Sequence, residues 1–193
     1  MSKGSNRPFC GGTLISANHV LTAAHCTGSS NFDIIVGEHD ISDASDGTRH
    51  EICRVENHPN YNLPTQLNND FSIVHLRNPV SLGARAVPAC LPDSSVAGDV
   101  LAGPPATSLT VSGWGTLSSG GAQPNVLHKV AVPAITNSQC TNSYGNSITN
   151  AMICAGNIAQ GGVDSCQGDS GGLCFINYLD QLLELLSSNE IKF

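Results

Sequence analysis

The apolar residues of this chain come in short runs that are rich in β-branched side chains and are separated by turn residues. Residues 32–36 (FDIIV) and 127–132 (LHKVAV) are two such runs, and each has the length of a strand rather than of a helix. The sequence also contains 20 glycines and 10 prolines, which favour turns and interrupt helices. Helix signals are scarce before residue 174. The pattern therefore predicts an all-β fold with frequent turns.

Length and charge narrow the range of functions. With 193 residues, the chain is long enough for one substantial domain or for two small lobes that share an interface. Only 12% of the residues are charged and the formal net charge is -7, so no basic surface is available to neutralise the phosphates of a nucleic acid. We therefore expect no nucleic-acid partner. The mild acidity is compatible with attraction of cationic substrates and equally with an ordinary soluble surface.

Residues 164–172 (DSCQGDSGG) are the stretch with the most chemical content. Ser170 is flanked by glycines, which allow a hydroxyl to be exposed and backbone N–H groups to approach a substrate carbonyl. This context makes Ser170 a candidate nucleophile. A serine hydroxyl is a weak nucleophile until a neighbouring base accepts its proton, so the interpretation requires a histidine and an orienting carboxylate elsewhere in the chain.

Both of these partners are present. His25 lies in residues 21–26 (LTAAHC), where small residues surround the imidazole, and it is the candidate base. Asp70 lies where a polar turn enters an apolar run, so a buried carboxylate there could face the imidazole. The other histidines have no comparable context and are expected to be polar residues of the surface or of strands: His19, His39, His50, His58, His75 and His128. Without a Cys-x-x-Cys or His-Glu-x-x-His pattern, the sequence predicts no zinc site and no cofactor.

With these candidates in the order His, Asp, Ser, the sequence resembles the trypsin/chymotrypsin family of serine proteases. Three further segments are similar to scaffold motifs of that family: residues 9–16 (FCGGTLIS), 90–92 (CLP) and 111–115 (VSGWG). The resemblance implies a double six-stranded antiparallel β-barrel with an incomplete second barrel. It makes residues 1–172 a protease domain with a first lobe to about residue 91, a crossover over 92–106 and a partial second lobe over 107–172.

The resemblance also implies roles for individual residues. The backbone N–H groups of Gly168 and Ser170 would form the oxyanion hole. Asp164, six residues before Ser170, would lie at the base of the substrate pocket. A desolvated carboxylate there favours an Arg or Lys side chain, because only a cation neutralises it.

Eight cysteines in a chain of this length imply an oxidising compartment if they pair. By resemblance, Cys10 pairs with Cys26 and Cys140 pairs with Cys154. The sequence leaves the pairing of the remaining cysteines open: Cys53, Cys90, Cys166 and Cys174.

The beginning of the chain departs from the family pattern. In the family, an Ile-Val-Gly-Gly-like amino terminus pairs with the residue that matches Asp169. Residues 1–8 (MSKGSNRP) contain neither this segment nor the apolar core of a signal peptide.

The end of the chain departs further. Beyond Gly172 the remaining family strands do not appear, and residues 173–193 form a divergent tail. Within residues 178–188 the leucines follow helical spacing, which predicts a short amphipathic helix. This helix would be too short and too charged to span a membrane. The two departures together predict weak protease activity, or none, for the 193 residues themselves.

Residues 36–40 (VGEHD) are similar to the start of a loop that binds calcium in some trypsins, and Asp43 and Asp46 continue its oxygen-rich sequence. The position of a closing acidic ligand falls near Arg49 or Glu51, and the register is not defined. We interpret the segment as a solvated acidic loop and assign no metal.

Two functional hypotheses follow. The first is a serine endopeptidase that cleaves after Arg or Lys through an acyl-enzyme on Ser170, with His25 as general base and then acid, and Asp70 orienting the imidazole. Its partners would be protein or peptide substrates and protein protease inhibitors, with no nucleic acid and no membrane, and its location would be extracellular. The alternative is a catalytically inactive, truncated protease homologue that acts, if at all, by binding.

Overall fold

Strands carry most of the regular structure of this protein. The computed structural model describes residues 1–3, 5, 7–28, 31–91, 108–118, 120–156, 168–176 and 181–186. Its strands are β1 (Thr13–Ser16), β2 (His19–Thr22), β3 (Ile34–Val36), β4 (Thr48–His50), β5 (Ile52–Asn57), β6 (Ser72–Leu76), β7 (Ser108–Gly113), β8 (His128–Ile135), β9 (Cys154–Ala155), β10 (Gly172–Ile176) and β11 (Gln181–Leu186). Short helical segments are η1 (Ala24–Thr27), α2 (Asn137–Tyr144) and η2 (Gly145–Ser147). The predicted all-β architecture is confirmed.

The first lobe is an antiparallel sheet with strand order β1-β2-β6-β5, accompanied by the β3-β4 hairpin. Along β6, burial alternates with period two, so that Ser72, Val74 and Leu76 face the interior. Val74 and Leu76 pack with Val20, Phe32 and Val80 in one apolar core. This core supports β2, which precedes His25, and β6, which follows Asp70.

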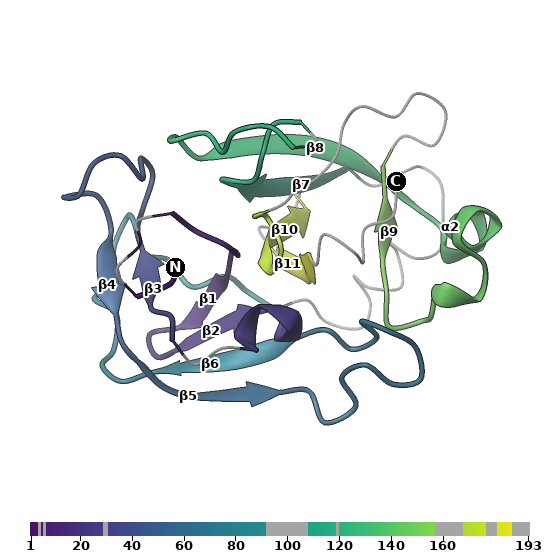
Figure 1. The fold of residues 1–193 in the computed structure, drawn as a ribbon, viewed down its shortest axis with the longest axis horizontal. Helices are drawn as coiled ribbons and strands as arrows, with labels where there is room; N and C mark the ends of the chain where they lie inside the picture. Colours follow the sequence, from purple (N-terminus) through teal and green to yellow (C-terminus); the bar gives the residue numbers. More distant parts are fainter. Residues whose placement is uncertain are drawn as a thin grey trace.

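The second lobe is an antiparallel sheet with strand order β11-β10-β7-β8-β9. It has an apolar core of its own, formed by Leu109, Val111, Val132, Ala134, Ala155 and Cys174. Figure 1 shows the strands of the first lobe, in purple and blue, beside those of the second lobe, in teal to yellow. The predicted boundaries of the two lobes stay a prediction, and the predicted crossover over 92–106 lies outside the described residues.

The helix predicted over 178–188 is wrong. The structure has the strand β11 at Gln181–Leu186, and it pairs antiparallel with β10, with Leu185 opposite Leu173. Helical spacing in so short a segment is a weak signal that tertiary context overrides. Pairing with β11 gives hydrogen-bond partners to an edge of β10 that would otherwise be unpaired.

The helix α2 was not predicted, although its start is encoded in the sequence. Thr136 precedes the helix and its hydroxyl accepts a hydrogen bond from the backbone N–H of Gln139. The Gln139 side chain accepts one from the backbone N–H of Thr136 in return. This reciprocal capping box satisfies donors that a helix start leaves unpaired. The Cys140–Cys154 disulfide then ties α2 to β9.

The lobes are joined along the segment that precedes β8. The backbone N–H of Ile41 donates to the carbonyl of Asn125, and the N–H of Leu127 donates to the carbonyl of His39, both at 2.8 to 2.9 Å. The indole N–H of Trp114 also donates to the His39 carbonyl. These bonds fix residues 125–127 of the second lobe on the first lobe.

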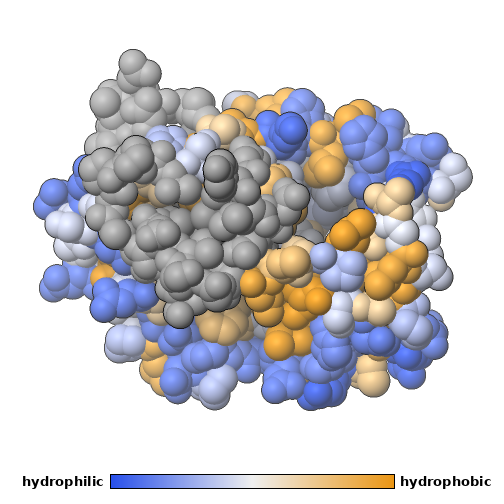
Figure 2. Space-filling view, turned by 180° about the vertical axis from the view of Figure 1, so that it is seen from behind, coloured by the Kyte–Doolittle hydropathy of each residue, from blue (hydrophilic) through white to orange (hydrophobic). Residues whose placement is uncertain are grey.

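The surface mixes polar and apolar residues. On the face seen in Figure 2, hydrophobic residues lie among hydrophilic ones, and individual side chains such as Leu63 and Val87 are more than half exposed. Apolar exposure of this kind is normal for a folded chain. Within the described residues, none of the helices has the length and apolar character needed to cross a membrane.

The core of the second lobe makes a direct stability prediction. Replacing Leu109, which is 1% exposed, by Ala leaves a cavity, and we expect the free energy of unfolding to fall by about 2 to 5 kcal/mol. Leu117, which is 66% exposed, is the control, because Leu117→Ala should change this free energy by less than about 0.5 kcal/mol. Urea unfolding of both variants with the disulfides intact measures the difference. Equal losses would show that this core is not packed as described.

Candidate functional site

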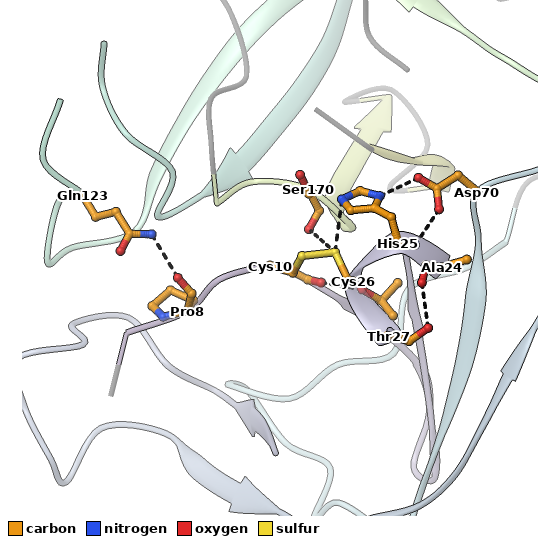
Figure 3. Close-up of a disulfide and its surroundings, with 11 residues drawn as sticks. Pro8, Cys10, Ala24, His25, Cys26, Thr27, Asp70, Gln123 and Ser170 are labelled. Atoms are coloured by element: carbon orange, nitrogen blue, oxygen red, sulfur yellow. Dashed lines mark hydrogen bonds and ion pairs between the residues drawn. A yellow bond between two sulfur atoms is a disulfide. The ribbon is translucent and has the colours of Figure 1, made fainter. Parts of the chain in front are cut away.

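His25 is placed by the turn that follows β2. The turn η1 begins directly after Ala23, and both Ala23 and Ala24 are almost fully buried. Larger side chains at these two positions would hold the turn away from the sheet. The next residue, Cys26, forms the predicted disulfide with Cys10, so the residue after the imidazole is tied covalently to the start of the first lobe (Figure 3).

Asp70 is buried and binds His25 through two contacts. Its carboxylate is 1% exposed and lies immediately before β6. Oδ1 accepts the backbone N–H of His25 at 2.8 Å, and Oδ2 lies 2.6 Å from His25 Nδ1. A buried carboxylate requires such partners, because water no longer solvates it. The contacts fix the orientation of the ring, whose other nitrogen, Nε2, lies 3.6 Å from Cys26 Sγ.

Ser170 reaches this pair from the second lobe, on a turn just before β10. It is 5% exposed, and its carbonyl accepts the backbone N–H of Gly11 at 2.7 Å. Gly171 has a φ of +74°, and a Cβ there would lie 2.4 Å from Thr22 Oγ1. Only glycine permits both this conformation and this close approach. Figure 3 shows Ser170 beside the imidazole of His25, on the side away from Asp70.

The carboxylate of Asp169 contacts two glycines for which the sequence alone predicted no role. Its Oδ1 accepts the backbone N–H of Gly115 at 2.7 Å. A Cβ on Gly113 or on Gly115 would lie 2.0 or 2.3 Å from a carboxylate oxygen. The two glycines of the 111–115 motif therefore leave the space in which the carboxylate sits. The two glycines on either side of Trp114 are the feature of the sequence from which this packing around Asp169 could have been predicted.

Other predicted site residues lie outside the described part of the chain. Asp164 and Cys166 belong to residues 157–167, which the structure does not describe. Cys53 and Cys90 are exposed and form no disulfide with the described residues. The predicted pairs Cys10–Cys26 and Cys140–Cys154 are both confirmed.

The side chains of Cys10, His25 and Cys26 lie close enough together to suggest a metal site. A cysteine binds a metal ion as a thiolate, whereas these two sulfur atoms are joined in a disulfide. The cluster therefore does not fit a metal ion.

In the acidic loop that resembles a calcium loop, Asp40, Asp43 and Asp46 use their carboxylates in other contacts, whereas the buried Oε1 of Glu38 has no hydrogen-bond partner among the described residues. Asp46 Oδ2 accepts the backbone N–H groups of His39 and Asp40 at 2.8 and 2.7 Å, and its Oδ1 pairs with the Arg85 guanidinium. Asp40 and Asp43 each accept bonds from the serine two residues further on.

The two positions at which a closing ligand was considered are also engaged. Arg49 pairs with Asp33, and Glu51 pairs with Arg77, each at 3.0 Å. Calcium requires six to eight oxygen ligands around one point. Carboxylates that are directed to backbone amides, serines and arginines do not fit such a site.

The electrostatics of this loop follow from the same contacts. The backbone N–H of Asp40 and the Arg85 guanidinium lower the pKa of Asp46 to about 2. Burial, followed by the neighbouring charge of Asp46, raises the pKa of Glu38. Arg85 thus supplies the positive charge that these carboxylates face.

A two-lobed, all-β chain with a histidine held by a buried aspartate beside a serine on a glycine turn belongs to the class of serine hydrolases. The comparisons with known proteins narrow the class. The Trypsin family model matches residues 1–177. Trypsin-2 of Salmo salar is 41% identical over 174 residues, 89% of this chain and 71% of the relative. Trypsin of Sus scrofa is 40% identical over 175 residues, again 89% and 71%.

The solved structures agree. The structure of neuropsin, a serine protease expressed in the limbic system of mouse brain, superposes with a TM-score of 0.81 at 30% identity, over 94% of this chain and 77% of neuropsin. The chain belongs to the trypsin family of serine proteases and is by family a hydrolase.

The Asp46 contacts predict a pH-dependent contribution to stability. Folding lowers the pKa of Asp46 to about 2, so its contribution is complete above the unfolded-chain pKa of about 4 and is lost as the pH falls through the folded value. We expect Asp46→Asn to lower the urea midpoint at pH 6 and to differ progressively less from the unaltered chain between pH 4 and pH 2. A difference that stays constant over this range would contradict the assignment.

Proposed function

We propose that the chain is a serine endopeptidase in which Ser170 is the nucleophile, His25 the general base and then acid, and Asp70 the group that orients the imidazole. The observation that carries the proposal is the position of His25, with Nδ1 2.6 Å from a buried carboxylate of the first lobe and the ring beside a serine of the second. Asp70 is 1% exposed, and burying a carboxylate beside His25 is costly unless the pair has a role that a surface histidine would not have.

The chemistry follows from the two ring nitrogens. Because Asp70 accepts a hydrogen bond from Nδ1–H, the lone pair of the imidazole lies on Nε2, which takes the Ser170 proton as the hydroxyl oxygen attacks a peptide carbonyl. The protonated imidazole then gives this proton to the leaving amine, and the C–N bond breaks. Water, deprotonated by the same nitrogen, releases the acid and restores Ser170. Asp70 stabilises the imidazolium in both halves of the cycle.

Negative charge develops on the substrate carbonyl oxygen in each half of this cycle. We assign its stabilisation to the backbone N–H groups of Gly168 and Ser170. The backbone of Gly168 has a φ of +105°, a conformation that glycine adopts far more readily than other residues. The requirement for glycine at this position supports the role.

The substrate class rests on Asp164. A carboxylate at the base of a desolvated pocket would select Arg or Lys at the residue before the cleaved bond. The net charge of -7 is compatible with cationic substrates. Protein protease inhibitors that present such a residue would bind to the same site.

An extracellular location fits the two disulfides, because disulfides persist in oxidising compartments. The alternative function is a catalytically inactive homologue that acts by binding. It predicts a different outcome in the same experiment.

Covalent labelling with an alkyl fluorophosphonate tests the nucleophile, because this probe reacts with activated serines. The endopeptidase proposal predicts stoichiometric phosphonylation of Ser170 in the folded, disulfide-bonded chain, detected by mass spectrometry, in contrast to the weak activity predicted from the sequence alone. Ser170→Ala abolishes labelling, and His25→Ala lowers its rate by several orders of magnitude.

The double variant of Ser170 and His25 should lose no more than either single one, because the residues act as a unit. Stoichiometric labelling would rule out the inactive homologue. No labelling of the folded chain would favour the binding homologue.

The specificity assignment has its own test. With Asp164→Ser the pocket loses the charge that pairs with a cationic side chain, and we expect hydrolysis of Arg and Lys esters to fall by about 10² or more relative to that of a Phe ester. The ratio of kcat/KM for the Arg and Phe esters measures the change. A chain that hydrolyses Phe esters as well as Arg esters before the substitution would contradict the assignment.

A further inference from the structure

Gly168 is surrounded on the side where a side chain would be. A Cβ built on it would lie 2.8 Å from Gln123 Nε2 and 3.3 Å from the Cα of Gly115. Real Cβ atoms essentially never lie as close to another atom as the first of these distances. The Gln123 carboxamide therefore occupies the space next to the Gly168 backbone in which a side chain would lie. Gly115 is also the residue whose N–H binds Asp169. The 168–169 backbone is therefore held between Gln123 and the 113–115 segment.

Gln123 is itself fixed by the first lobe. Its Nε2 donates to the Pro8 carbonyl at 3.0 Å, and Figure 3 shows the side chain reaching Pro8 on the side of Ser170 away from Asp70. The backbone carbonyl oxygen of Gln123 also lies 3.5 Å from Arg7 Nη1, which donates to it. The carboxamide thus makes two contacts at once, one to the segment before Cys10 and one to Gly168.

The rest of the loop has little means of holding Gly168. The residues that precede Gln123 are Gly120, Gly121 and Ala122, which have no side chain beyond a methyl group. The residues that follow it are bonded to residues 39–41 of the first lobe. Gln123 is where the anchored end of the loop meets the backbone of the proposed oxyanion hole.

We propose that Gln123 is a positioning residue for the oxyanion-hole N–H of Gly168, an inference that rests on the function proposed above. The Pro8 carbonyl holds the Gln123 carboxamide, and the carboxamide limits the motion of the Gly168 backbone. The φ of +105° at Gly168 is a conformation that needs such support, because glycine alone explores many others. The site then depends on contacts between the lobes as well as on its three reacting groups.

Three variants test the role. Gln123→Ala removes the carboxamide. Gln123→Glu keeps its size but replaces the donor to the Pro8 carbonyl by an acceptor. Leu117→Ala is the control in the same loop, because Leu117 is 66% exposed. Urea unfolding confirms that each variant is folded to the same extent as the unaltered chain.

The first readout is phosphonylation of Ser170 by the alkyl fluorophosphonate. We expect both Gln123 variants to lower the maximal rate by about tenfold, the effect of one hydrogen bond, with little change in the half-saturating probe concentration. Leu117→Ala leaves both values unchanged. A general structural defect would instead lower the unfolding midpoint, or change both kinetic values. Rates in the Gln123 variants equal to that of the unaltered chain would overturn the proposal.

The second readout is independent of activity. In protein labelled with ¹⁵N-glycine, the relaxation order parameter of the Gly168 amide should fall from about 0.85 to below about 0.6 in the two Gln123 variants and stay unchanged in the Leu117→Ala control. If the unaltered chain does not react with the probe, the proposed function fails, and this order parameter alone decides the role of Gln123. An unchanged order parameter at Gly168 would show that the carboxamide does not position it.

Discussion

Of the hydrogen bonds between the lobes, the one at the candidate site runs from the backbone N–H of Gly11 to the carbonyl of Ser170 at 2.7 Å, and the relative position of the site residues depends on it. Each lobe has its own apolar core, so neither core fixes how far the lobes stand apart. The site is divided between them, and proton transfer tolerates errors of only about 0.5 Å. Thr22 adds to this contact, because its hydroxyl donates to the Gly11 carbonyl while the absence of a side chain at Gly171 lets the serine turn approach. This part of the interface is made largely of backbone, and it requires glycine at its points of closest approach, Gly11 and Gly171.

The second requirement is the burial of Asp70. A charged group that is 1% exposed would destabilise the fold without compensation. Here the compensation comes from the backbone N–H and the ring of one residue, His25. Because the backbone contact survives any change of side chain at this position, part of the stabilisation of Asp70 is independent of the imidazole. In the proposed cycle, the fold can therefore keep the carboxylate in place while the ring accepts and returns the serine proton.

Much of the site could be predicted from the sequence because it is encoded locally. His25, Ser170 and the cysteines of both disulfides stand in short motifs whose residue types are required by the chemistry, and the structure confirms both disulfides. Contacts between distant segments were not predictable in this way. The packing of Gly113 and Gly115 around Asp169, and the pairing of Arg85 with Asp46, depend on which loops meet in space. The prediction for the tail was wrong for a related reason: the leucine spacing of 178–188 suits a helix in isolation, whereas pairing with the open edge of β10 makes Gln181–Leu186 a strand.

The register of β10 connects the second lobe to the chemistry. β10 begins two residues after Ser170, and Leu173 lies opposite Ser112 of β7. Gly113, the next residue along β7, borders the Asp169 carboxylate. A slip of one residue between the two strands would move Ser170 by about 3.3 Å and turn every side chain of β10 to the other face of the sheet. It would also take Asp169 away from the Gly115 N–H. The buried face of the sheet, including Cys174 at 2% exposure, opposes such a slip, so the apolar core of the second lobe fixes the position of a serine that lies outside it.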